Sequence, residues 1–277
     1  MIVGGIDVGG KNVHVVIMKD GEMLAKGDSP TGIQKAEAAE RLYDEVLEQA
    51  SLKRADVERV VATGSASKRA AFAQGMIADA AADARGVIRL IPSARTIIDV
   101  GAEEGRAIKA SPEGKVLDFA INEKCAAGTG TFVEAMARAL EISVEDMARI
   151  SLESTRSIPM NAQCAVFGES EVVSLIHAKT EKRDIARAVH DAIAGRIASV
   201  ARIVGLEKDV VLIGGMARNV GFVESLRKEI GMDVVVPDDP DFVGALGAAA
   251  AATAGVLEEE VEAKVVEKEK YEEGKAS

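Results

Sequence analysis

Hydrophobic and polar positions alternate at the start of the chain, in three short runs that predict β-strands. The runs "IVGGIDVGG", "VHVVIM" and "EMLAKGDS" are rich in Val and Ile and follow one another closely. The dipeptide Asp20-Gly21, between the second and third runs, is a strong turn signal. The chain is therefore expected to open with a β-hairpin meander of three strands.

Further along, the pattern changes repeatedly between helical spacing and short apolar runs. "GIQKAEAAERLYDEVLEQASL" predicts a helix with one apolar face, formed by Ala38, Leu42, Val46 and Leu47. "VERVVATGS" predicts a buried strand ending in a glycine turn, and "ASKRAAFAQGMIADAAADARGVIRL" a mostly helical stretch. Helices are also predicted by "TFVEAMARALEI", "VEDMARISLES" and "EKRDIARAVHDAIAGRIASVARIVGL". Two strand, turn and helix units follow, "DVVLIGGMARNVGFVESLRKEIG" and "MDVVVPDDPDFVGALGAAAAATAGVL".

The opening motif occurs twice, which indicates an internal repeat. "IDVGG" begins at Ile6, and "IDVGA" begins at Ile98; each leads into a strand, a turn and another strand. We therefore expect two related lobes, an N-terminal lobe over residues 1–96 and a C-terminal lobe over residues 97–255. The C-terminal helix is expected to cross back to the first lobe, and residues 256–277 form a Glu- and Lys-rich, solvated tail.

Composition excludes several classes of protein. The net charge of −11 argues against a broad nucleic-acid surface, and 3% aromatic residues without Trp argue against base stacking. The chain has no apolar run long enough to span a membrane and no export signal at its start, so we expect a cytoplasmic location. Two Cys residues do not make a disulfide framework. The three His residues lack ligand-like spacing and are expected to be ordinary surface or partly buried residues.

Four glycine turns stand where phosphate groups could bind. "DVGG" follows the first strand and "DVGAEEG" is its second copy, so Asp7 and Asp99 occupy equivalent positions. "CAAGTGTF" precedes a helix, whose N-terminus favours anions, and "IGGMARN" ends a strand. Together they favour a nucleotide between two lobes, with Mg²⁺ held by the two Asp carboxylates through water.

These motifs resemble those of a known family. "GIDVGG", "TIIDVGAEEG", "NEKCAAGTGTF", "CAVFGESEV" and "IGGMARN" are similar to the acetate kinase/sugar kinase/Hsp70/actin ATPases, and within them to the BadF/BadG/BcrA/BcrD branch. The resemblance implies an α/β fold of two actin-like (ribonuclease H-like) ATPase lobes, with a nucleotide cleft between them that binds ATP and Mg²⁺.

The resemblance also implies roles for individual residues. Catalytic roles fall on Asp7, Asp99, Glu103 and Glu104. Binding of the nucleotide falls on two phosphate loops, a third loop that closes on the phosphates and a fourth near the adenosine: Gly9, Gly10, Lys11 and Asn12; Gly101 and Ala102; Gly128, Thr129 and Gly130; and Gly214, Gly215 and Asn219.

Both phosphate loops depart from the family pattern. The first usually has Ser or Thr after Asp-x-Gly and a Lys a few residues on, whereas this chain has Gly10 and then His14 at the Lys position. The second usually reads Gly-Gly-Gln-Asp, and here Glu103 and Glu104 end it. Either glutamate could orient water or bind Mg²⁺; alternatively, ATP is bound with slow hydrolysis.

The two Cys residues, Cys125 and Cys164, each precede a predicted helix. On the residues alone, two buried structural thiols are the simpler interpretation. Both fall on the positions at which the family holds one 4Fe–4S cluster between two chains. A cluster of this kind usually takes four thiolates, and two chains together supply four.

The implied function is an ATP-dependent electron-transfer subunit. "ARGVIRLIPSARTIIDVGAEEGRAIK" looks most like the D-type ATPase subunit of benzoyl-CoA reductase, which implies reduced ferredoxin or flavodoxin as donor, a second ATPase chain, and catalytic reductase subunits as acceptor. A homodimeric activator of a 2-hydroxyacyl-CoA dehydratase is the alternative within the branch. A small-molecule kinase of the same fold and a non-catalytic actin-like module are alternatives from other classes.

Overall fold

The computed structural model describes residues 1–122, 129–160 and 165–259, and its first three strands form the expected meander. These strands are β1 (Ile2–Val8), β2 (Asn12–Lys19) and β3 (Glu22–Pro30), each antiparallel to the next. Asp20 and Gly21 both have positive φ, 53° and 89°, which gives the two-residue turn the twist that a hairpin needs. The predicted turn is therefore confirmed.

The first sheet has the strand order β11-β5-β4-β1-β2-β3 within the described residues. It adds β4 (Arg59–Thr63), β5 (Gly75–Ile77) and β11 (Glu258–Glu259) to the meander, and β4 runs parallel to β1. Helix α1 (Lys35–Gln49) covers one face with the predicted apolar residues, all of which are buried. A short 3-10 helix, η1 (Arg54–Asp56), leads into β4.

The stretch over residues 66–90, expected to be mostly helical, contains a strand. It forms a short 3-10 helix, η2 (Ser67–Arg69), then β5, and only then α2 (Asp79–Leu90). Three residues are too few to produce a recognisable hydrophobic period. β5 forms because β4 and β11 pair with it on either side, which is a tertiary contact that the local pattern does not contain.

The five strands of the second sheet repeat five of the six strands of the first, and β11 is the strand without a counterpart. Its order is β10-β9-β6-β7-β8, made by β6 (Thr96–Val100), β7 (Gly105–Ala110), β8 (Val116–Ile121), β9 (Val210–Ile213) and β10 (Val234–Val235). β6 is antiparallel to β7 and parallel to β9, as β1 is to β2 and β4. The register repeats as well, because Asp7 lies opposite His14 and Asp99 lies opposite Arg106. The predicted internal repeat is thus confirmed over the whole sheet.

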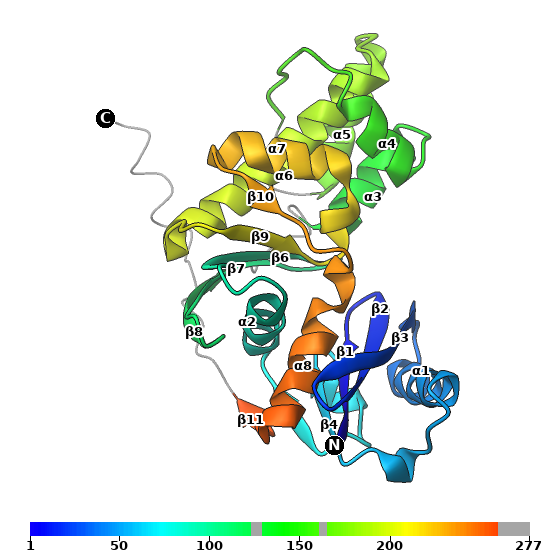
Figure 1. Cartoon of the computed structure of the whole chain (residues 1–277). Helices are drawn as coiled ribbons and strands as arrows, with labels where there is room; N and C mark the ends of the chain where they lie inside the picture. Colours follow the sequence, from blue (N-terminus) through cyan, green and yellow to red (C-terminus); the bar gives the residue numbers. More distant parts are fainter. Residues whose placement is uncertain (123–128, 161–164, 260–277) are drawn as a thin grey trace.

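Two helices form a layer between the sheets, α2 and α8 (Val243–Ala254) (Figure 1). α2 packs on the second sheet and α8 on the first, and the two helices pack on each other. A Cβ at Gly247 would lie 1.8 Å from the carbonyl oxygen of Ala82, so only glycine permits this approach. The lobe limits at residues 96 and 255 remain predictions; α8, which they assign to the C-terminal lobe, contacts the first sheet.

The other face of the second sheet is covered by helices. They are α3 (Gly130–Ala139), α4 (Val144–Ser151), α5 (Ala165–His177), α6 (Lys182–Val204) and α7 (Val220–Ile230). Of the 3-10 turns, η3 (Gly215–Arg218) leads from β9 into α7, and η4 (Pro240–Phe242) leads from β10 into α8. The expectation of a surface or partly buried position is wrong for His190, which is fully buried on α6. No helix of the described part of the chain is both long and apolar enough to cross a bilayer.

Candidate functional site

A cavity of about 890 Å³ opens between the two sheets, where β1, β4, β6 and β9 all end. Both lobes line it, as expected for a ligand held at the carboxyl ends of parallel strands. The lining contains most of the residues predicted from the sequence: Asp7, Gly9, Gly10, Lys11, Asn12, Asp99, Gly101, Ala102, Glu103, Glu104, Gly130, Gly214, Gly215 and Asn219. The structure brings these residues together; their roles toward a nucleotide remain predictions.

The first loop joins β1 to β2 and is held by its own backbone. The N–H of Gly9 donates to the carbonyl of Asn12 at 2.9 Å, and the Thr31 hydroxyl donates to the carbonyl of Gly9 at 3.1 Å. Lys11 leaves this loop to pair with Glu134 on α3, across the mouth of the cavity. The side chain that carries the loop's positive charge therefore contacts the second lobe.

The second loop, between β6 and β7, has the same internal bond, from the N–H of Gly101 to the carbonyl of Glu104 at 2.9 Å. Two of its carbonyls accept from the first turn of α3, since the N–H of Gly130 donates to Gly101 at 3.0 Å and that of Thr131 to Ala102 at 3.0 Å. These two N–H groups of α3 donate to the second loop and are therefore not available to bind a phosphate group.

The two loops also touch each other. A Cβ at Gly10 would lie 2.6 Å from a carboxylate oxygen of Glu103, so the glutamate rests directly on the first loop. A side chain at position 10 would not fit beside this carboxylate without movement of the glutamate. Gly10 and Glu103 therefore bring the two loops into direct contact.

Two glycines at equivalent positions lie directly against the two aspartates, Asp7 and Asp99. Gly64 follows β4 with φ +95°, and a Cβ there would lie 2.3 Å from an Asp7 oxygen. Gly214 follows β9 with φ +81°, and a Cβ there would lie 2.4 Å from an Asp99 oxygen. The sequence predicted Gly214 as a site residue and missed Gly64. The glycine turn "ATGS" was the available signal, because it ends a strand as "IGG" does.

A buried arginine, also missed from the sequence, stands among four carboxylates. The Arg106 guanidinium lies 2.8 Å from Glu104, 3.0 Å from Asp79, and 3.6 Å from both Asp83 and Asp99. Asp79 and Asp83 belong to α2, whereas Asp99 belongs to β6 and Glu104 to the second loop. Arg106 thus ties the helix between the sheets to the loop at the cavity.

Burial and the repulsion between neighbouring carboxylates raise the pKa values of three aspartates at this site. Burial, and then the neighbouring Asp79 and Asp99, raise the pKa of Asp7 to about 7, although Arg106 opposes the shift. Burial also raises the pKa of Asp99 to about 6 and that of Asp83 well above its ordinary value. Added positive charge would relieve this repulsion, and Mg²⁺ prefers such oxygen donors. Among the described residues, no three His, Cys, Asp or Glu side chains converge closely enough to hold a metal directly.

The part of the cavity lining that comes from the second lobe includes apolar side chains and a buried amide. Met216, Val144 and Ala148 line it beside Asn219. The Asn219 side-chain oxygen accepts from the N–H of Phe222 at 2.9 Å and so caps α7. Its amide nitrogen has no partner in the described part of the chain, although the residue is only 6% exposed. This donor could serve a bound base or ribose.

Some predicted residues lie elsewhere. Thr129 is fully buried and does not line the cavity; its hydroxyl lies 3.1 Å from that of Thr131. Gly128, Cys125 and Cys164 lie outside the described residues. The proposed ligands of a cluster are therefore known here only by the helices that follow them.

Comparisons with known proteins give one consistent family. The model of the BadF/BadG/BcrA/BcrD ATPase family matches residues 5–252. An activator of lactoyl-CoA dehydratase from Anaerotignum propionicum is 38% identical over 245 residues, 88% of this chain and 95% of that one. A subunit of benzoyl-CoA reductase from Thauera aromatica is 34% identical over 259 residues, 90% of this chain and 92% of that one.

Two solved structures agree with the fold over almost their whole length. Component A of (R)-2-hydroxyglutaryl-CoA dehydratase from Acidaminococcus fermentans has a TM-score of 0.88 and 34% identity, covering 92% of this chain and 99% of that one. The activator of 2-hydroxyisocaproyl-CoA dehydratase from Clostridium difficile, with bound ADPNP, has a TM-score of 0.86 and 35% identity, covering 92% and 96%. The expected fold of two ATPase lobes is confirmed.

Proposed function

The chain belongs to the BadF/BadG/BcrA/BcrD ATPase family, and on that premise we propose that it is an ATP-dependent activator of a 2-hydroxyacyl-CoA dehydratase. The sequence alone favoured a benzoyl-CoA reductase subunit, with the activator as alternative. The preference reverses because the 38% relative and both similar structures are activators or dehydratase components, whereas the reductase subunit is a more distant match.

One observation carries the proposal, which is the link between the cavity and α3. The second loop is bonded to the first turn of α3 through Gly130 and Thr131, and the first loop is paired to the same helix through Lys11 and Glu134. A nucleotide that moves either loop would therefore move α3. Cys125 stands five residues before α3 in the sequence. A movement of α3 on ATP binding would in this way be transmitted along the chain to Cys125.

The arrangement of the two helices that follow the thiols supports a 4Fe–4S cluster. A Cβ at Gly168, in the first turn of α5, would lie 2.8 Å from the ring of Phe132, in the first turn of α3. The two helices therefore start side by side, and Cys164 is bonded directly to the first residue of α5. We propose that Cys125 and Cys164 of two chains hold the cluster. When bound, it supplies one-electron transfer at low potential.

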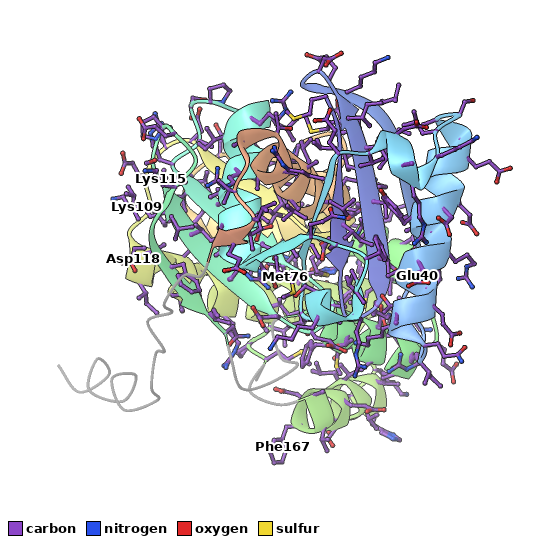
Figure 2. All side chains as sticks on the ribbon, turned by 90° about the horizontal axis from the view of Figure 1, so that it is seen from below. Glu40, Met76, Lys109, Lys115, Asp118 and Phe167 are labelled. Atoms are coloured by element: carbon purple, nitrogen blue, oxygen red, sulfur yellow. The ribbon has the colours of Figure 1, made fainter. Side chains whose placement is uncertain are left out.

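The surface of α5 supports a second chain as partner. Val166 and Phe167 are 68% and 66% exposed, and Val173 and Ile176 are also exposed. Figure 2 shows Phe167 projecting outward from this helix. Exposed apolar side chains gathered on one helix indicate a contact surface, and its position beside Cys164 matches a cluster shared between two copies. Ferredoxin or flavodoxin would be the donor and the dehydratase the acceptor.

The test is anaerobic purification followed by activity with candidate acceptors. The proposal expects a brown homodimer with four irons per dimer that activates a 2-hydroxyacyl-CoA dehydratase only with ATP and a reductant. Cys125→Ala and Cys164→Ala should each abolish the chromophore, whereas Ser170→Ala, an exposed change on α5, should leave it. A stable hetero-oligomer that reduces an aromatic CoA thioester would support the reductase instead. A colourless protein that phosphorylates a small molecule would support the kinase.

A further inference from the structure

The repeat between the lobes shows one asymmetry at the cavity. In the second lobe the N–H of Gly214 donates to a backbone carbonyl, that of Pro240, at 3.0 Å. In the first lobe the equivalent N–H, of Gly64, donates to the side chain of Asp79 at 2.7 Å. The hydroxyl of Thr63 donates to the same Asp79 oxygen at 3.1 Å. A charged side chain thus replaces a neutral carbonyl at one of two matched positions.

The replacement has a structural consequence, because a carboxylate has a second oxygen. The other oxygen of Asp79 lies 3.0 Å from a guanidinium nitrogen of Arg106. Thr63 and Gly64 end a strand of the first sheet, while Arg106 is on β7 of the second. Asp79 therefore joins the two lobes through one carboxylate. We call Thr63, Gly64, Asp79 and Arg106 the interlobe bridge.

All four residues of the interlobe bridge line the cavity, and the bridge contacts residues at or beside both loops. The side chain of Arg106 is 9% exposed and also pairs with Glu104 of the second loop at 2.8 Å. Gly64 lies against Asp7, at the end of β1 before the first loop. A charge-assisted bond to a buried arginine is strong, and Asp79, at 3.0 Å, is closer to Arg106 than Asp83, the other carboxylate of α2, at 3.6 Å. The bridge therefore resists any movement that separates the two loops.

We propose that Asp79 is a positioning residue that holds the cleft closed through Arg106, so that the interlobe bridge limits how fast nucleotide is released. The proposal rests on the nucleotide function proposed above. It adds a point at which opening of the cleft is controlled. The first lobe uses an acid as the acceptor at this position, whereas the second lobe completes the matching turn with a backbone carbonyl.

The experiment compares variants that cut the bridge with one that cuts a similar ion pair elsewhere. Asp79→Asn keeps the acceptor for Gly64 and removes the charge that faces Arg106, and Arg106→Gln removes the other partner. Lys109→Gln is the control, because Lys109 lies on the same strand and pairs with Glu207 at 3.0 Å within the second lobe. Figure 2 shows Lys109 at the outer surface. Arg106→Lys tests rescue by a smaller cation.

Two measurements separate positioning from simple stability. Stopped-flow release of a fluorescent ADP with Mg²⁺ should be at least about tenfold faster in Asp79→Asn and Arg106→Gln than in wild type, the size expected for loss of a charge-assisted bond. The double variant should release no faster than the single ones, and Arg106→Lys should recover part of the effect. Small-angle scattering of the nucleotide-free variants should give a larger radius of gyration, and Lys109→Gln should match wild type in both.

The result that overturns the proposal is a release rate and radius in both cut variants equal to those of Lys109→Gln, or single effects that add fully in the double variant. If Asp79→Asn does not fold, Thr63→Val takes its place, because it removes the hydrogen bond that the Thr63 hydroxyl donates to Asp79. The same increases in release rate and radius of gyration are then expected of Thr63→Val. If wild type binds no nucleotide, the proposed function fails. The scattering comparison still decides whether the bridge holds the lobes together.

Discussion

Gly64 and Gly214, the two glycines behind Asp7 and Asp99, leave no room for a side chain. Alanine at either position would combine positive φ with a Cβ closer than 2.5 Å to a carboxylate oxygen. We expect Gly64→Ala and Gly214→Ala each to lower the free energy of unfolding by about 2–4 kcal/mol, as backbone strain and overpacking add, and to weaken nucleotide binding. Urea denaturation and calorimetry measure the two effects.

Gly21 provides the control for this prediction. It has φ +89°, but none of the described residues comes within 4 Å of a Cβ there, so Gly21→Ala reports strain without overlap. We expect it to cost only about 1–2 kcal/mol and to leave nucleotide binding unchanged. Equal nucleotide affinity in all three variants would argue that the glycines serve the turns alone.

His190 gives the fold a predictable dependence on pH. Burial, and then the charge of Arg187, lower the pKa of His190 from 6.5 to about 3. Below pH 6.5 the unfolded chain binds a proton that the buried imidazole of the folded chain does not, so the contribution of His190 to stability falls as pH drops from about 6.5 toward 3, by up to about 1.4 kcal/mol per pH unit. The raised pKa values of Asp7 and Asp99 act in the opposite direction over the same range, because the folded chain binds their protons at a higher pH than the unfolded chain does. The wild type should therefore lose stability relative to His190→Leu as pH falls from 7 to 4.5 in urea titrations.

The exposed His177 serves as the comparison, since His177→Leu changes an imidazole that the fold does not bury. The free energy of unfolding of His177→Leu, measured in urea, should depend on pH as that of the wild type does. Parallel curves for wild type and His190→Leu would mean that water or a proton reaches the buried ring.

At the scale of elements, the contact between α2 and α8 depends on the absence of a side chain at Gly247. Alanine there would place a Cβ 1.8 Å from the Ala82 carbonyl and would force the helices apart. We expect Gly247→Ala to lower the free energy of unfolding by about 2–3 kcal/mol in chemical denaturation. Gly195→Ala on α6, where a Cβ meets none of the described residues within 4 Å, should instead stabilise by about 0.5–1 kcal/mol. A small effect at Gly247 would indicate that the helix pair can slide.

Long amphipathic elements and turns with a strong local signal could be predicted from the sequence. α1, α6, the Asp20-Gly21 turn and the repeat of the Asp-Val-Gly motif all have their information within a short window. β5 could not be predicted, because its three residues are a strand only through pairing with β4 and β11. The α8 helix was recognisable as a helix by its composition, and it packs on the first sheet, as expected of a C-terminal helix that crosses back to the first lobe.

The candidate site divides in the same way. Asp7 and Asp99 could be found because their motif is repeated. Asp79 and Arg106 could not, because one looks like an ordinary helix start and the other like a charged residue on a strand. The contact between Asp79 and Arg106 follows only from the arrangement of the two lobes. Arg106 lies opposite Asp99 in the second sheet, as His14 lies opposite Asp7 in the first.

At the scale of the whole molecule, the charge of the cavity predicts dependence on a divalent cation. Nine carboxylate side chains line it among the described residues, against one lysine and two arginines. ADP alone would enter a region of its own sign, so chelation of Mg²⁺ should weaken ADP binding at least about tenfold by calorimetry. Glu103→Gln should reduce this dependence, and Glu40→Gln, on the outer surface in Figure 2, should not. Equal affinity with and without Mg²⁺ would contradict the cation's role.

The return of α8 to the first sheet bears on how the chain is made. The ribosome synthesises the first lobe's strands before any other part, yet the inner face of that sheet, with Val3, Val16 and Val61, is covered mainly by α8. Those side chains stay largely uncovered until residues 243–254 emerge, after the whole second lobe. The first lobe therefore cannot complete its folding until the second lobe has been synthesised, and for most of that time its apolar face is available to chaperones.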